Sequence, residues 1–262
     1  MTDWLEVCRA AVEDVRGVLA AMPTRVEREP VLRQGEGGDD TTAIDAEVER
    51  VVLDRLRPLG VSIVSEEVGR IDGSSTLVVV DPIDGSLNAK RNIPFFALSI
   101  AVADGDRMDD VHFAYVHDFG SGEEWTARRG EGAWLGDDRL GAVRPKERIE
   151  ILNFEATLTS LVAERAAAFT GIAHRLRVMG SLALSLCHLA AGRVDGVCSL
   201  KEARSVDIAA AQLLCSEVGI AMSLFDDPRA FGEAELDLGK RSRIAAAGTP
   251  ELCRQIADAL SG

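Results

Sequence analysis

The chain has 262 residues, of which 47% are hydrophobic and 27% charged. This apolar content excludes an intrinsically disordered chain, and the length suits one large domain or two subdomains that share a core. Acidic residues outnumber basic ones by 43 to 29, and the net charge of -14 disfavours a nucleic-acid partner because such a surface repels phosphate backbones.

Neither disulfides nor membrane insertion are expected. The five cysteines are scattered without a CxxC pair, so the sequence indicates neither a disulfide framework nor a zinc knuckle. The first residues lack a signal-peptide pattern, and no apolar run reaches the length of a bilayer span. We therefore expect a cytoplasmic protein with no membrane partner.

The first half of the chain predicts two helices followed by strands. Apolar residues at helical spacing predict a helix over 3–21 with Asp3 as its cap, and a Gly-rich acidic loop over 33–40 leads into a second helix from Thr42 to about Pro58. Strands are predicted at 61–64, 77–80, 95–103, 111–116 and 124–127, with a hairpin arm at 130–138.

Strands and helices alternate in the second half. A polar stretch over 141–148 separates a proposed N-terminal subdomain, 1–142, from a C-terminal one, 143–262. Beyond it, strands are predicted at 149–154, 194–198 and 244–247, and helices at 157–169, 181–191, 207–217 (with Gly219 as the stop) and 250–260. This pattern favours a layered α/β protein.

The most informative stretch is Asp81-Pro-Ile-Asp84-Gly85-Ser86, which ends a β-branched run. Two carboxylates at a strand end, with proline between them, are suited to converge on hard cations. Gly85 permits close backbone approach, and Ser86 can begin a helix whose N–H groups receive a phosphate oxygen. The alternative is an ordinary turn, because Asp-Pro and Asp-Gly are common turn dipeptides.

Other acidic residues stand at element ends. Glu66 and Glu67 end a predicted strand, and Asp207 begins a predicted helix, as does Asp45. A plain helix cap explains either aspartate in isolation.

Six short motifs resemble the inositol monophosphatase family, the lithium-sensitive, magnesium-dependent phosphatases. Residues 81–88 are similar to its D-P-x-D-G-(T/S)-x-N signature. The other five, in chain order, are 39–45 (D-x-x-T-x-x-D), 65–67 (G-E-E), 130–135 (G-x-G-A), 177–181 (R-x-x-G-(S/T)) and 206–210 (W-D-x-A-A). Two departures, Val206 for tryptophan and Ser86 for threonine, resemble archaeal-type members, some of which hydrolyse both inositol 1-phosphate and fructose 1,6-bisphosphate.

The resemblance implies an α+β fold, a layered αβαβα sandwich, with two or three Mg²⁺ ions for which Mn²⁺ substitutes. The implied metal ligands are Glu66, Asp81, the Ile83 carbonyl, Asp84 and Asp207, with Asp81 bridging two ions. The implied catalytic residues are Asp45, Ser86 and Glu66. Thr42 and Glu67 are expected to position these residues without binding the metal or the substrate themselves. Oxygen ligands favour magnesium or manganese over zinc, and divalent cations neutralise the phosphoryl charge.

The implied substrate contacts are Gly85, Ser86, Arg177, Gly180, Ser181 and Arg204. Arg204 lies where family members discriminate substrates, but a solvated surface charge is an equally good interpretation. Arg177 has an intersubunit or structural ion pair as its alternative.

The resulting hypothesis is a Mg²⁺-dependent phosphatase, a homodimer, acting on a sugar or polyol phosphate monoester such as inositol 1-phosphate or fructose 1,6-bisphosphate. One alternative is a 3′,5′-bisphosphate nucleotidase. Another is an adaptor with a vestigial site, whose role is to bind a protein partner.

Overall fold

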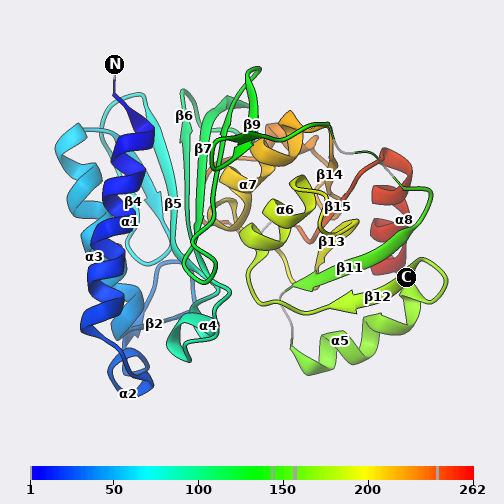
Figure 1. Ribbon diagram of the computed structural model, residues 1–262, viewed down its shortest axis with the longest axis horizontal. Coiled ribbons are helices and arrows are strands. Elements are labelled where there is room, and N and C mark those ends of the chain that lie inside the picture. Colours follow the sequence, from blue (N-terminus) through cyan, green and yellow to red (C-terminus); the bar gives the residue numbers. More distant parts are fainter. Residues whose placement is uncertain (1, 143, 145, 156–157, 240–241) are drawn as a thin grey trace.

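Two β-sheets separate three layers of helices in this computed structural model, which describes residues 2–142, 144, 146–155, 158–239 and 242–262 (Figure 1). The layers run in the order helices, sheet, helices, sheet, helices. The predicted αβαβα sandwich is therefore confirmed.

The first sheet has eight strands in the order β10-β9-β8-β7-β6-β5-β3-β4. β3 and β5 are parallel, and the other neighbours are antiparallel. The strands are β3 (Ser62–Ser65), β4 (Gly69–Ile71), β5 (Leu77–Asp84), β6 (Ala97–Ala103), β7 (Val111–Asp118), β8 (Glu124–Arg128), β9 (Gly132–Leu135) and β10 (Asp138–Arg139). A separate pair, β1 (Val31–Gln34) and β2 (Asp40–Thr42), flanks the predicted Gly-rich loop.

Helices α1 (Trp4–Ala21) and α3 (Ala43–Leu56) cover the outer face of this sheet, and Asp3 caps α1 as predicted. β5 is buried along its whole length. Its side chains alternate: Val78 and Val80 pack with the outer helices, whereas Leu77 and Val79 face the middle helices. A continuous β-branched run fits a strand covered on both faces.

The middle layer is formed by α6 (Leu182–Ala190) and α7 (Ser205–Glu217). Both are buried nearly all round because a sheet lies on each side of them. The second sheet has the order β12-β11-β13-β15-β14, with bounds Ala173–Arg177, Ile149–Glu155, Gly196–Ser199, Ile244–Ala247 and Ala221–Leu224. α5 (Thr159–Arg165) and α8 (Pro250–Ser261) cover its outer face.

Several short elements were not predicted: β1, β2, β4, β12, β14, α2 (Arg25–Arg28) and α4 (Ser86–Lys90) apart from its start at Ser86. They are too short to carry a clear periodicity. The described 3₁₀ turns lie at 57–59, 108–110, 166–169 and 231–233.

Three predictions are corrected or left outside the structure. The helix predicted over 157–169 is α5 followed by a 3₁₀ turn at Ala166–Phe169, and Thr157 lies outside the described residues. Asp45 and Asp207 are not the capping residues themselves, since Thr42 and Arg204 occupy those positions. The polar stretch over 141–148 includes Val143 and Pro145, which also lie outside the described residues.

None of the described helices is long and apolar enough to cross a membrane.

Candidate active site

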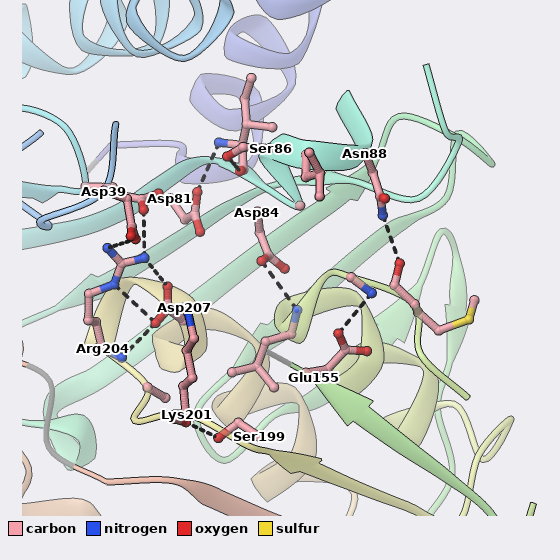
Figure 2. Close-up of a pocket in the computed structure, with 18 of the residues that line it drawn as sticks. Asp39, Asp81, Asp84, Ser86, Asn88, Glu155, Ser199, Lys201, Arg204 and Asp207 are labelled. Carbon is pink, nitrogen blue, oxygen red and sulfur yellow. Dashed lines mark hydrogen bonds and ion pairs between the residues drawn. The ribbon is translucent and has the colours of Figure 1, made fainter. Parts of the chain in front are cut away.

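A pocket of about 430 Å³ opens where β5 ends, between the two sheets (Figure 2). Side chains that are distant in sequence meet there, from β5, β11, the turn after β3 and the start of α7. Nine of the residues singled out in the sequence line it: Glu66, Asp81, Ile83, Asp84, Gly85, Ser86, Gly180, Arg204 and Asp207. Thr42, Asp45, Glu67, Arg177 and Ser181 are not among its lining residues.

The end of β5 presents the first two carboxylates. The register between β5 and β6 is irregular between Asp81 and Asp84, where proline interrupts the strand. Asp81 accepts a hydrogen bond from the Ile83 amide at 3.0 Å, and the Ser86 hydroxyl donates to the Ile83 carbonyl at 3.0 Å. Asp81 and Asp84, both on β5, line the pocket.

Asp84 is held by the first turn of α6. Its carboxylate accepts hydrogen bonds from the Ala183 amide at 2.7 Å, from the Leu182 amide at 3.3 Å and from the Ser181 hydroxyl. Burial raises the pKa of Asp84 to about 6, although the Ser181 hydrogen bond opposes the rise. Ser181 also caps α6 by accepting from Leu184, so it reaches the site through Asp84.

Glu49, on α3, holds the turn that carries Glu66. One oxygen of this buried carboxylate accepts from the Ser65 hydroxyl at 2.6 Å and from the amides of Glu67 and Val68 at 3.1 and 3.0 Å. Glu66 then lines the pocket, whereas Glu67 hydrogen-bonds Thr41 away from it. The sequence analysis missed Glu49; its only signal was a glutamate flanked by apolar helix positions.

Arg204 lies among the predicted metal ligands. Its Nη2 atom donates to Glu66 Oε1 at 2.6 Å and to Asp207 Oδ1 at 3.0 Å, and Nε lies 3.3 Å from Asp207 Oδ2 (Figure 2). Nη1 donates to the Gly37 carbonyl at 3.3 Å. The residue is only 8% exposed, so it is not the solvated surface charge considered above.

The side chains of Glu66, Asp81, Asp84 and Asp207 offer carboxylate oxygens to a cation in this pocket. Burial, with neighbouring Asp207 and Glu67, raises the pKa of Glu66 to about 8, although Arg204 opposes this. Burial and the nearby Glu66 and Asp84 carboxylates also raise the pKa of Asp81. Buried like charges of this kind are relieved by a hard divalent cation, so the donor set fits Mg²⁺ or Mn²⁺.

Within the described part of the chain, no three acidic, histidine or cysteine side chains converge closely enough to hold an ion as they stand. The Arg204 Nη2 atom lies between Glu66 and Asp207 and is hydrogen-bonded to one oxygen of each.

Asp45 lies beside the pocket. Its Oδ2 atom accepts from the Thr42 amide at 3.0 Å and from the Thr42 hydroxyl at 2.6 Å, and it lies 3.4 Å from Lys90 Nζ. Its Oδ1 atom is buried and has no hydrogen-bond partner. Among the described residues no hydrogen bond joins Asp45 to Ser86; the Ser86 hydroxyl donates to the Ile83 carbonyl instead.

Residues 177–181 cross the pocket mouth. Arg177 is exposed and its guanidinium donates to the Leu176 carbonyl at 3.0 Å, away from the pocket. The Gly180 amide donates to Glu155 at 2.9 Å, and the Asn88 side chain donates to the Met179 carbonyl at 2.8 Å (Figure 2). Glu155 and Asn88 line the pocket and were not predicted.

Comparison with known proteins agrees with this geometry. Residues 3–261 match the model of the inositol monophosphatase family. The chain is 33% identical over 225 residues to the fructose-1,6-bisphosphatase/inositol-1-monophosphatase of Thermococcus kodakarensis, which covers 85% of this chain and 84% of the relative. It is also 33% identical over 203 residues to Nus factor SuhB of Escherichia coli, covering 73% and 74% of the two chains.

The fold is similar to the crystal structure of an inositol monophosphatase–fructose 1,6-bisphosphatase, with a TM-score of 0.86 and 27% identity, covering 98% of this chain and all of that one.

Proposed function

Because this chain belongs to the inositol monophosphatase family, it is a metal-dependent phosphoric monoester hydrolase, and we propose that its substrate is a sugar or polyol phosphate. The observation that carries the proposal is the meeting of four buried or half-buried carboxylates, from three separate segments of the fold, at one pocket: Glu66, Asp81, Asp84 and Asp207. The names of the archaeal relatives support inositol 1-phosphate and fructose 1,6-bisphosphate as the first substrates to test.

We propose Mg²⁺ as the metal, with Mn²⁺ able to replace it. Glu66, Asp81 and the Ile83 carbonyl would hold one ion, and Asp81, Asp84 and Asp207 a second; a third would share Glu66. Bound divalent cations offset phosphoryl charge and make a water molecule more acidic. The all-oxygen donor set supports this choice.

The chain's own residues orient the reactants. Gly85 and Ser86 begin α4 and line the pocket, which supports backbone donation to the phosphate. The unpartnered Oδ1 of Asp45 is an acceptor suited to orient an attacking water, with Ser86 and Glu66 as the other candidates for that task. Lys201 and Gly180 line the same pocket and would face the rest of the substrate.

The place of Arg177 favours its alternative role at a subunit interface. Its guanidinium is exposed outside the pocket. Three large apolar side chains, Leu87, Ile93 and Val178, are 63%, 47% and 51% exposed, and Leu87 and Val178 also line the pocket. We propose that they are covered in a homodimer. Light scattering on the purified protein tests this, and a monomer at micromolar concentration would refute it.

A phosphate-release screen tests the activity. The purified chain is assayed on inositol 1-phosphate, fructose 1,6-bisphosphate and adenosine 3′,5′-bisphosphate, with Mg²⁺ and with a chelator. We expect the sugar or polyol phosphates to be hydrolysed only with metal, and Asp81→Asn or Asp84→Asn to abolish turnover while the circular dichroism spectrum is retained. Preference for the nucleotide would establish the nucleotidase alternative, and full activity in either variant would refute the metal assignment.

A second candidate function has one specific observation in its favour: a relative with 33% identity is named as a Nus factor rather than as a phosphatase. A role in binding a protein partner would survive the loss of catalysis. If the folded Asp81→Asn variant still complemented a deletion of the gene, this second function would be supported.

A further inference from the structure

The guanidinium of Arg204 lies between two of the proposed metal ligands, where a metal cation would be bound. A single nitrogen, Nη2, lies 2.6 Å from a Glu66 oxygen and 3.0 Å from an Asp207 oxygen. These oxygens belong to two of the residues that we propose as metal ligands. They come from segments 138 and three residues away from Arg204, so the arginine joins ligands of two different parts of the fold.

The surrounding chain is built to accommodate this side chain. Arg204 directly precedes α7, and its amide donates to Asp207 Oδ2 at 2.7 Å, which anchors the base of the side chain. Its tip extends to the Gly-rich loop after β1. A Cβ atom added at Gly37 would lie 2.5 Å from Nη1, so a side chain there would collide with the guanidinium.

A metal ion and this guanidinium exclude each other. Divalent magnesium binds carboxylate oxygens at about 2.0–2.1 Å, which leaves no room for a nitrogen hydrogen-bonded to the same two oxygens between them. The metal ion and the guanidinium are both positively charged, and at the same two oxygens in a buried site they would also repel each other strongly. Without any cation, Glu66, Asp81 and Asp207 would repel one another at low dielectric.

We infer that Arg204 is a displaceable internal cation: it holds Glu66 and Asp207 together in the metal-free protein and is driven out when a divalent metal binds. The inference rests on the proposed function, in that it takes both acids to be metal ligands. Asp39, whose carboxylate lies 3.5 Å from Nη1 and is largely exposed, is the adjacent anion toward which the released guanidinium would turn. Arg204 is thus a positioning residue that competes with the metal.

Mn²⁺ binding to the metal-free, full-length protein tests this without any measurement of activity. Free Mn²⁺ is followed by electron paramagnetic resonance during titration of the wild type, Arg204→Gln and Arg33→Gln. Arg33→Gln is the matched control. Arg33 donates to the Glu67 carbonyl and faces Glu49, so its substitution removes one nearby charge without freeing Glu66 or Asp207. Hydrogen bonds between charged groups are strong enough for Arg204→Gln to bind Mn²⁺ about tenfold more tightly than the wild type. Arg33→Gln should change the dissociation constant by less than about twofold, since exposed charges interact weakly.

Equal or weaker binding by Arg204→Gln would overturn the inference and leave the proposed metal site intact. Absence of Mn²⁺ binding in all three proteins would instead overturn the proposed function, and the inference with it. If Arg204→Gln does not fold, Arg204→Lys replaces it, because its ammonium group lies at the end of a shorter side chain and cannot replace the bonds that Nε and Nη1 make to Asp207 and to the Gly37 carbonyl; tighter binding is again expected. In crystals of the wild type loaded with Mn²⁺, a guanidinium still hydrogen-bonded to both acids would also refute the inference.

Discussion

Asp45 and Asp207 occupy the same place in two different helices. Each is the third residue of its helix, α3 or α7, and each uses Oδ2 to accept a hydrogen bond from the amide of the residue that precedes the helix, at 3.0 Å from Thr42 and 2.7 Å from Arg204. The helix start therefore fixes one oxygen of each carboxylate. The other oxygen of each carboxylate takes no part in this bond: Oδ1 of Asp45 is buried and unpartnered, and Oδ1 of Asp207 accepts from Arg204.

Two substitutions can separate the structural role of Asp45 at the helix start from the role of its negative charge. Asp45→Asn keeps an oxygen that accepts from Thr42 but loses the negative charge, so we expect the turnover number to fall by at least about a hundredfold with little change in melting temperature. Asp45→Ala also loses the hydrogen bonds from the amide and hydroxyl of the capping residue Thr42, which costs about 1 kcal/mol of stability, or roughly 2–4 °C in melting temperature for a chain of this size. Steady-state kinetics and thermal unfolding measure the two effects.

The control for Asp45 is Asp3→Asn, which changes the cap of α1 outside the pocket. It should leave turnover unchanged. Wild-type turnover in Asp45→Asn would show that this charge has no catalytic role.

The sequence predicted the layers and the pocket's acidic residues for a physical reason. Long elements carry a periodicity that their burial requires, and the segment over 81–86 places two carboxylates at the end of a buried strand, in the order of the family motif. The sequence also predicted that Asp45 and Asp207 lie near helix starts, although it did not predict their exact place relative to the capping residue.

The supporting residues could not be predicted in the same way. The sequence around Glu49 and Glu155 gives no sign of their roles, and Asn88 entered only as the last residue of the motif over 81–88; the partners of all three lie on other elements. The contact between Arg204 and Glu66 spans 138 residues of chain. No local pattern encodes such a pairing, because it depends on how the two sheets are stacked.

Ser181 is expected to act on the site through Asp84. Ser181→Ala removes the hydroxyl that both caps α6 and donates to Asp84, so we expect a loss of about 1 kcal/mol in stability together with weaker metal binding. Ser181→Thr keeps the hydroxyl and should restore most of both. Chemical denaturation and Mn²⁺ titration of the two variants provide the measurement, and a Ser181→Ala protein with wild-type metal affinity would contradict this role.

Gly85 is expected to tolerate no side chain. Its φ is +92°, and an added Cβ would lie 3.0 Å from the Gly180 carbonyl oxygen and 3.1 Å from that of Phe95. Gly85→Ala should therefore lose both stability and activity. Gly122 is the matched control, since it has a φ of +78° with nothing within 4 Å of an added Cβ. Gly122→Ala should show only the backbone strain of about 1–2 kcal/mol, with activity retained.

The comparison of the two alanine variants isolates the close approach of α4 to the segment over 177–181. Thermal unfolding and phosphate release are measured on both proteins. Equal losses of stability in the two would mean that the contact between Gly85 and Gly180 contributes nothing beyond backbone conformation.

Glu155 is expected to make the stability depend on pH. Burial raises the pKa of its carboxyl to about 8, against a reference value of 4.5, although hydrogen bonds from Ser185 and Gly180 oppose the rise. Between these two values the folded protein keeps a proton that the unfolded chain releases. Its contribution to stability is therefore fully present below pH 4.5, falls as the pH rises and is lost by about pH 8.

Glu155→Gln cannot titrate, so it should lack this component. We expect its melting temperature to be near that of the wild type at pH 5 and to exceed it by roughly 10 °C at pH 9, both measured with a chelator present. Glu150→Gln is the control on the same strand, where the carboxylate is exposed and pairs with Lys146, and its pH profile should follow the wild type. Parallel profiles for Glu155→Gln and the wild type would mean that Glu155 is already ionised in the folded protein at pH 5, and that the hydrogen bonds from Ser185 and Gly180 outweigh its burial.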